Sequence, residues 1–146
     1  MSMLSADKIK EMLTSTDLKK IVSDSETQEK IKAGFGKSFD MVKEQLGDNW
    51  QDVKSIYEMS FDSMFDLKTE VKYVSLAALA YLISPYDLLP ESKLGALGLV
   101  DDVAVLLFAM NYAKPEIIRY AEFKNEQQKE LDALAQLKPS DDEAMA

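Results

Sequence analysis

The chain has 146 residues, of which 47% are hydrophobic, and a formal net charge of −9. This length is typical of one domain with a hydrophobic core. The sequence contains no Cys and no His, which excludes disulfides, zinc sites built from these residues, and Ser-His-Asp catalysis. The acidic charge argues against nucleic-acid binding, which requires a positive surface, and is compatible with a basic protein partner or with solubility alone.

Only 5 Gly and 4 Pro residues are present, which favours long helices over a β-sandwich. The amino-terminal residues show no apolar run after a basic start, so we expect no signal peptide and a cytoplasmic protein. Residues 5–13 form a short amphipathic pattern, and Thr16 is placed to cap a second short helix. We therefore expect residues 1–24 to form short amino-terminal helices.

A long helix is predicted to follow, because Ser25-Glu-Thr-Gln28 is a capping box. Its apolar residues recur at spacings of three and four, as on a helix that packs on a core: Ile31, Phe35, Phe39, Val42 and Leu46. Gly34 and Gly36 weaken this helix and favour the close approach of another element. Gly47 is expected to end it, and residues 48–51 to cap the next helix.

The next helix carries a second apolar stripe: Val53, Ile56, Tyr57, Ser60, Phe61, Met64 and Phe65. Asp66 is then placed to cap a third long helix, from Leu67 to Ile83. After Val71 this helix is apolar on all sides, which predicts burial in protein or in lipid. The uncharged run of residues 73–86 is shorter than the roughly 20 residues that span a bilayer, so burial in protein is favoured.

Residues 85–100 are expected to form a loop, since Pro85 ends the preceding helix. A second apolar helix is predicted over residues 103–113. Pro115 then stands at the first position of a final helix that ends near residue 137, because proline is favoured there. The second half of this helix is highly charged, with a narrow line of leucines that can pair with another helix or another protein: Leu131, Leu134 and Leu137.

These patterns predict an all-α fold, a single-domain bundle of five to seven helices. At its centre we expect an apolar antiparallel hairpin of residues 67–83 and 102–113, because helices joined by a short loop usually pack antiparallel. The helical domain is expected to cover residues 25–137. Residues 138–146 are expected to be a disordered tail.

The most specific pattern is Tyr81-Leu-Ile-Ser-Pro-Tyr-Asp-Leu-Leu-Pro90, followed by Gly98-Leu-Val-Asp-Asp102. Residues 73–110 thereby resemble the YkvA-like family, whose domain is numbered one-two-three-two among domains of unknown function. The motif positions are Ser84, Pro85, Asp87, Pro90, Gly98, Asp101 and Asp102. The sequence lacks a second proline that is common in the family's loop, and Leu99 replaces a frequent aromatic residue. The resemblance implies a small helical bacterial protein, sometimes membrane-associated, and identifies no catalytic residue.

The hairpin topology would place four acids at one pole of the bundle: Asp87, Glu91, Asp101 and Asp102. Buried carboxylates require partners, because an unpaired one costs several kcal/mol. The favoured interpretation is structural, in which Asp87 accepts loop N–H groups, Asp101 caps the second hairpin helix, and Asp102 pairs with a Lys or with Arg119. Two alternatives stay open, a Mg²⁺, Mn²⁺ or Ca²⁺ site and a catalytic carboxylate pair.

From these features we expect a non-enzymatic helical interaction module of a bacterial cytoplasmic protein, without a cofactor. It would bind a basic protein through an acidic surface, as an immunity-like protein binds a toxin. Two other functions stay open. One is a membrane-associated scaffold that uses the apolar hairpin, and the other is a divalent-metal-dependent enzyme that uses Asp87, Asp101 and Asp102.

Overall fold

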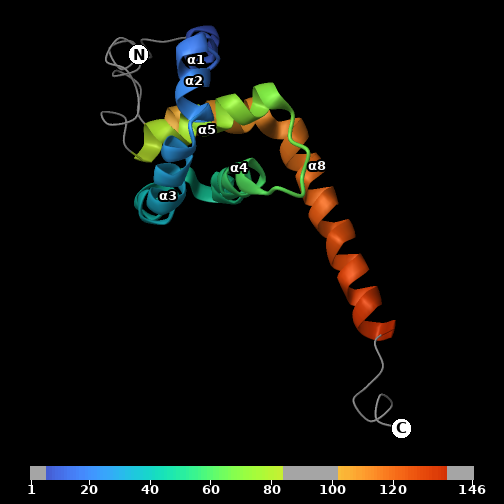
Figure 1. The fold of residues 1–146 in the computed structure, drawn as a ribbon. Helices are drawn as coiled ribbons and strands as arrows, with labels where there is room; N and C mark the ends of the chain where they lie inside the picture. The colour runs from blue at the N-terminus through green and yellow to red at the C-terminus, as the bar shows by residue number, and fades with distance from the viewer. Residues whose placement is uncertain (1–5, 84–101, 138–146) are drawn as a thin grey trace.

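A computed structural model of the chain describes residues 6–83 and 102–137. Every regular element in these residues is helical, which confirms the all-α prediction. The elements are α1 (Ala6–Leu13), α2 (Thr16–Ser23), α3 (Ser25–Leu46), the short 3-10 helix η1 (Gly47–Asn49), α4 (Trp50–Phe61), α5 (Thr69–Ile83) and α8 (Asp102–Leu137). Figure 1 shows the helices gathered into a bundle, from which the second half of α8 projects.

Helix α5 forms the centre of the bundle. All of residues 74–82 are buried, so no side of this part of the helix faces solvent. The helix packs against α1, α2, α3, α4 and α8, and its contact with α8 is the most extensive of these. An apolar surface around the whole circumference matches this position, because each side of α5 meets another helix. Burial in protein was predicted from the sequence and is confirmed here.

The first apolar stripe packs as predicted, since all five of its residues on α3 are buried. Gly34 lies so close to α5 that a Cβ atom at this position would be 2.6 Å from Cγ2 of Ile83. At Gly36 no atom of the described residues lies within 4 Å of such a Cβ, so of these two glycines it is Gly34 that serves a close approach in the described part. Gly47 ends α3 with φ at 58°, a value that favours glycine.

Three of the predicted helix caps are wrong. Ser25 is the first residue of α3, and the cap is Asp24, whose Oδ2 accepts a hydrogen bond from the Thr27 N–H at 3.2 Å. The Gln28 side chain donates instead to the Val22 carbonyl at 2.8 Å, which ties α3 to α2. No side chain caps α4, because η1 leads directly into it. Ser15 rather than Thr16 caps α2, through the Leu18 N–H.

The second stripe is buried at Val53, Ile56, Ser60 and Phe65, but Met64 is 72% exposed. The reason is that α4 ends at Phe61, so helical spacing no longer places Met64 on the buried face. Helix α5 begins at Thr69, two residues later than predicted. Residues 62–68 form a connecting loop. Its backbone hydrogen bonds join residues that are close in the sequence, as from the Leu67 N–H to the Phe65 carbonyl at 3.1 Å.

Helix α8 is continuous across Pro115, which contradicts the prediction of two helices. Proline removes one backbone hydrogen bond and its ring clashes with the preceding turn, so it commonly bends a helix without ending it. Figure 1 shows that α8 changes direction where it leaves the bundle. Before the bend it runs along α5, and after Tyr120 and Phe123, which still pack on Phe65, the helix projects into solvent.

The connection between α5 and α8 lies outside the described residues, so the predicted hairpin turn stays a prediction. The short helices α1 and α2 contribute Leu13, Leu18 and Val22 to the same hydrophobic core as α5. Within residues 6–83 and 102–137, no helix combines the length and hydrophobicity needed to cross a membrane.

Candidate functional site

The predicted acidic cluster falls largely outside the structure described above. Asp87, Glu91 and Asp101 lie in the segment 84–101, as do the motif residues Ser84, Pro85, Pro90 and Gly98. Asp102 is the first residue of α8, and its side chain is likewise outside the described part. In the described ranges no group of three acidic side chains is arranged to hold a metal ion. The metal and catalytic interpretations of the motif therefore stay predictions.

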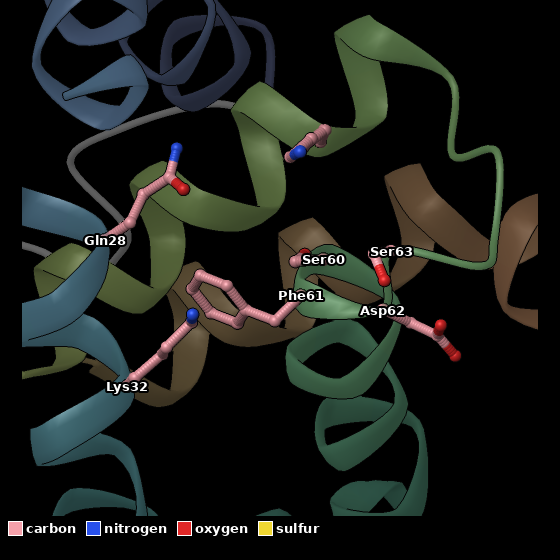
Figure 2. Close-up of a pocket in the computed structure, with 7 residues that line it drawn as sticks. Gln28, Lys32, Ser60, Phe61, Asp62 and Ser63 are labelled. Atoms are coloured by element: carbon pink, nitrogen blue, oxygen red, sulfur yellow. The ribbon is translucent and has the colours of Figure 1, made fainter. Parts of the chain in front are cut away.

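A small recess of about 180 Å³ lies where the end of α4 meets α3 and α5. Its lining residues are Gln28, Lys32, Ser60, Phe61, Asp62, Ser63 and Lys72. Figure 2 shows Lys32 of α3 reaching towards Phe61 at the end of α4, whereas the Gln28 side chain points away from this ring, towards the Val22 carbonyl to which it donates. The Lys32 ammonium lies 5.2 Å from the centre of the Phe61 ring, a distance suited to a cation–π contact.

The chemistry of this recess is limited. The Ser60 hydroxyl donates to the Ile56 carbonyl at 2.7 Å, so it is not paired with a base. The Asp62 carboxylate accepts hydrogen bonds from the Met64 N–H at 2.9 Å and from the Tyr120 hydroxyl at 2.9 Å. Figure 2 shows this carboxylate turned away from Phe61. Among the described residues the recess thus offers no hydroxyl paired with a base, and its Lys32 ammonium also lies 3.4 Å from the Glu29 carboxylate.

A second polar cluster joins α8 to the loop of residues 62–68. Glu116 is only 3% exposed, and its carboxylate accepts the Lys68 N–H at 2.9 Å. Arg119 donates to the same carboxylate through Nε at 2.7 Å and through Nη2 at 2.9 Å. Arg119 also donates to the Asp66 carbonyl, and its guanidinium lies 4.3 Å from the centre of the Phe65 ring. We call Glu116, Arg119 and the loop residues they hold the loop clamp.

The hydrogen bonds from Arg119, followed by that from the Lys68 N–H, lower the pKa of Glu116 from 4.5 to about 2 against the opposing effect of burial. One turn later, burial and the hydrogen bond to Asp62 raise the pKa of Tyr120. Two residues before Glu116, the Lys114 ammonium lies 2.7 Å from the Asp52 carboxylate on α4. Residues 114–120 are thus held to α4 and to the loop immediately before α8 leaves the bundle.

The projecting half of α8 carries a line of exposed leucines. Leu131 is 56% exposed, Leu134 is 64% exposed and Leu137 is 79% exposed. At about 100° per residue, Leu131 and Leu134 lie on the same side of the helix as Tyr120 and Phe123. These two aromatic residues pack on Phe65, with ring centres 4.9 and 5.3 Å away. The face that packs on the bundle therefore continues outward as an apolar face in solvent.

One family of known sequences matches the part of the chain that contains helix α5, the start of α8 and the segment between them. Residues 71–108 match the family described as Protein of unknown function (DUF1232). This match confirms the resemblance that the motif indicated. The DUF1232 segment thus contains the most buried helix of the bundle, whereas the projecting half of α8 lies beyond it.

The chain is also similar to two vertebrate proteins named E3 ubiquitin-protein ligase RNF170. The Xenopus laevis protein is 30% identical over 86 residues, which cover 54% of this chain and 34% of the relative. The Danio rerio protein is 33% identical over 85 residues, which cover 53% of this chain and 32% of the relative. The chain therefore spans about a third of the length of these relatives. No solved structure matches the chain.

Sequence analysis missed the loop clamp. The spacing of Glu116 and Arg119, one turn apart on a helix, is visible in the sequence, but such pairs are usually exposed and weak. What distinguishes Glu116 is its burial and its hydrogen bond to Lys68, which is 48 positions away in the sequence. The sequence did indicate the leucine line, which the structure places on the projecting part of α8.

Proposed function

We propose that this protein is a non-enzymatic, cytoplasmic interaction module. The second half of α8 projects from the bundle and serves as a docking helix for another protein. The observation that carries the proposal is the exposure of Leu131, Leu134 and Leu137 on one projecting helix. We call these three residues the docking face. A helix with an apolar face is a common form of protein recognition, in which residues spaced by three and four enter a groove or meet a second helix.

The position of the docking face supports this function. An isolated helix of this length is only marginally stable in water, so it gains from being continued out of a folded body. The loop clamp and the Lys114–Asp52 ion pair hold α8 to the bundle directly before the projecting part. The helix is therefore anchored at one end and presents its leucines beyond the surface of the bundle.

An interaction role also agrees with the chemistry of the described residues. The recess beside Phe61 contains no serine paired with a base, and the buried carboxylate of Glu116 is neutralised by Arg119. The relatives are named for ubiquitin ligation, but this chain spans only about a third of their length. The similarity therefore supports a related helical segment rather than that activity.

Photo-crosslinking in the cells that produce the protein tests this proposal. A benzophenone amino acid at Leu134 samples the docking face, and the same group at Gln136 samples the opposite side of the helix. We expect a discrete crosslinked protein from the first position only, and its loss when Leu131→Ser is added. Equal crosslinking at both positions, or none at either, would contradict the proposal.

A further inference from the structure

We propose that the partner of the docking face is a basic amphipathic helix. This inference rests on the proposed function and names the kind of surface that the leucines meet. Two properties of the described residues support the inference: the distribution of charge around the leucines, and the geometry by which α8 leaves the bundle.

Acidic side chains lie along one edge of the docking face. At about 100° per residue, Glu126 and Glu130 lie on the same side of the leucine line, and Leu137 extends the line at this edge. Glu130 makes no hydrogen bond or ion pair within the described part of the chain. Glu126 lies 3.6 Å from Lys129, but both side chains are more than 60% exposed, so this ion pair is weak and leaves the carboxylate accessible.

The other edge of the docking face adds little opposing charge. Lys124 lies there, near the bundle, and its ammonium donates to the Gln127 side chain at 3.2 Å. Gln128 and Ala135 continue this edge outward. A partner helix that covers the leucines therefore meets carboxylates on one side and mostly neutral side chains on the other. Lys or Arg residues along one edge of the partner helix would complement these carboxylates.

A second copy of the chain fits this face poorly in either orientation. In an antiparallel pair related by twofold symmetry, the same edge of each helix faces itself. This symmetry brings the acidic edges of the two copies to the same side of the pair, and the negative charge that gathers there disfavours pairing. In a parallel pair, each bundle would occupy the space of the other, because the docking face continues the side of α8 that packs on its own bundle.

The dimensions of the docking face set the length of the partner. The projecting helix from Lys124 to Leu137 covers about 14 residues, or roughly 20 Å at 1.5 Å per residue. A partner helix of about four turns covers this length. Its apolar residues would recur at spacings of three and four to meet Leu131, Leu134 and Leu137, with basic residues flanking them on one side.

Binding of designed peptides to the full chain, measured by fluorescence anisotropy, tests the inference. The probe is a helical peptide of 18 residues with leucines at spacings of three and four and lysines along one edge. A matched peptide carries glutamates in place of the lysines. We expect the basic peptide to bind at least about fivefold more tightly, as two exposed ion pairs would supply.

Charge reversal on the protein separates specific pairing from general attraction to an acidic chain. Glu126→Lys with Glu130→Lys should abolish or invert the preference between the two peptides. The control, Glu122→Lys with Asp132→Lys, makes the same change of net charge on the side of the helix away from the leucines. We expect the control to retain most of the preference, and an equal loss in both variants would overturn the inference.

Failure of this inference is distinguishable from failure of the proposed function. If the crosslink at Leu134 requires Leu131 but the cellular partner is unaffected by Glu126→Lys with Glu130→Lys, the docking helix stands and a basic partner is excluded. Sedimentation of the purified chain provides a further check. A dimer that Leu131→Ser dissociates would identify a second copy as the occupant and overturn the inference.

Discussion

Glu116 and Arg119 form a bidentate ion pair on α8, with hydrogen bonds of 2.7 and 2.9 Å, at the point where the helix leaves the bundle. Glu116 is buried, whereas the Arg119 side chain is 44% exposed. The pair reaches across to the loop between α4 and α5, because Glu116 accepts the Lys68 N–H and Arg119 donates to the Asp66 carbonyl. This ion pair thus holds the loop between α4 and α5 against α8, directly before the part of α8 that projects from the bundle.

Replacement of Glu116 by Gln should destabilise the protein. The substitution keeps the size of the side chain but removes the charge that Arg119 and the Lys68 N–H complement. Because Arg119 is partly exposed and can rehydrate, we expect a loss of about 1–3 kcal/mol in the free energy of unfolding. Urea denaturation measures this value. Glu122→Gln, one to two turns later on the exposed helix, should change it by less than about 0.5 kcal/mol.

The contribution of Glu116 should disappear in acid. A carboxyl group with a pKa lowered by folding stabilises the native state above its unfolded pKa, and this contribution declines as the pH falls to the folded pKa. For Glu116 these values are 4.5 and about 2. The difference in unfolding free energy between wild type and Glu116→Gln should therefore be constant near neutral pH and shrink between about pH 4.5 and 2. A difference that stays unchanged down to pH 3 would contradict this assignment.

The two glycines of α3 should respond oppositely to alanine. Gly36 has open space at the Cβ position, so Gly36→Ala should stabilise the helix by up to about 1 kcal/mol. At Gly34 the added carbon would lie 2.6 Å from Ile83 Cγ2, on a β-branched side chain with little freedom to move. Gly34→Ala should therefore destabilise the protein by about 1–3 kcal/mol. Thermal unfolding of the two variants side by side measures the contrast.

The parts of the fold that were predicted from the sequence are those with local periodic signals. The stripe on α3 and the all-apolar helix α5 were recognised because packing follows directly from spacing and hydrophobicity. Gly47 was recognised as a helix end because its conformation requires a residue without a Cβ. These predictions needed no knowledge of which elements meet in space.

Predictions failed where tertiary contacts decide the local structure. The sequence predicts that a helix starts at Pro115, but contacts on both sides of this residue hold α8 together. Lys114 pairs with Asp52, and Glu116 accepts the Lys68 N–H. The loop clamp escaped prediction for the same reason, since its members lie about 50 residues apart in the sequence. The acidic motif remains a sequence prediction, because its residues fall outside the described ranges.

Removal of the Ser75 hydroxyl should not destabilise the protein. Ser75 is fully buried on α5, and its Oγ has no hydrogen-bond partner among the described residues. A buried unpaired hydroxyl is unfavourable, so Ser75→Ala should raise the free energy of unfolding by about 1 kcal/mol. Ser60→Ala is the matched control, because the Ser60 hydroxyl donates to the Ile56 carbonyl at 2.7 Å and its removal should be neutral or destabilising. Equal effects of the two substitutions in urea denaturation would contradict the expectation.

Replacement of Pro115 by Ala should change the direction of the projecting helix. Proline lacks the backbone N–H for the regular helical hydrogen bond, and its ring pushes against the preceding turn. Alanine restores the bond and fits a straighter helix, so the docking face should shift relative to the bundle. The chain contains no Cys, so spin labels can be attached cleanly through Lys54→Cys on α4 and Gln136→Cys on α8.

Electron–electron distance measurements between these labels report the shift. We expect Pro115→Ala to move the distance distribution by several Å, since the two labels lie on opposite sides of the bend. Asn111→Ala, an exposed position on α8 before the bend, is the control and should leave the distribution unchanged. If Pro115→Ala also leaves it unchanged, the direction of the helix is set by the loop clamp and the Lys114–Asp52 pair rather than by the proline ring.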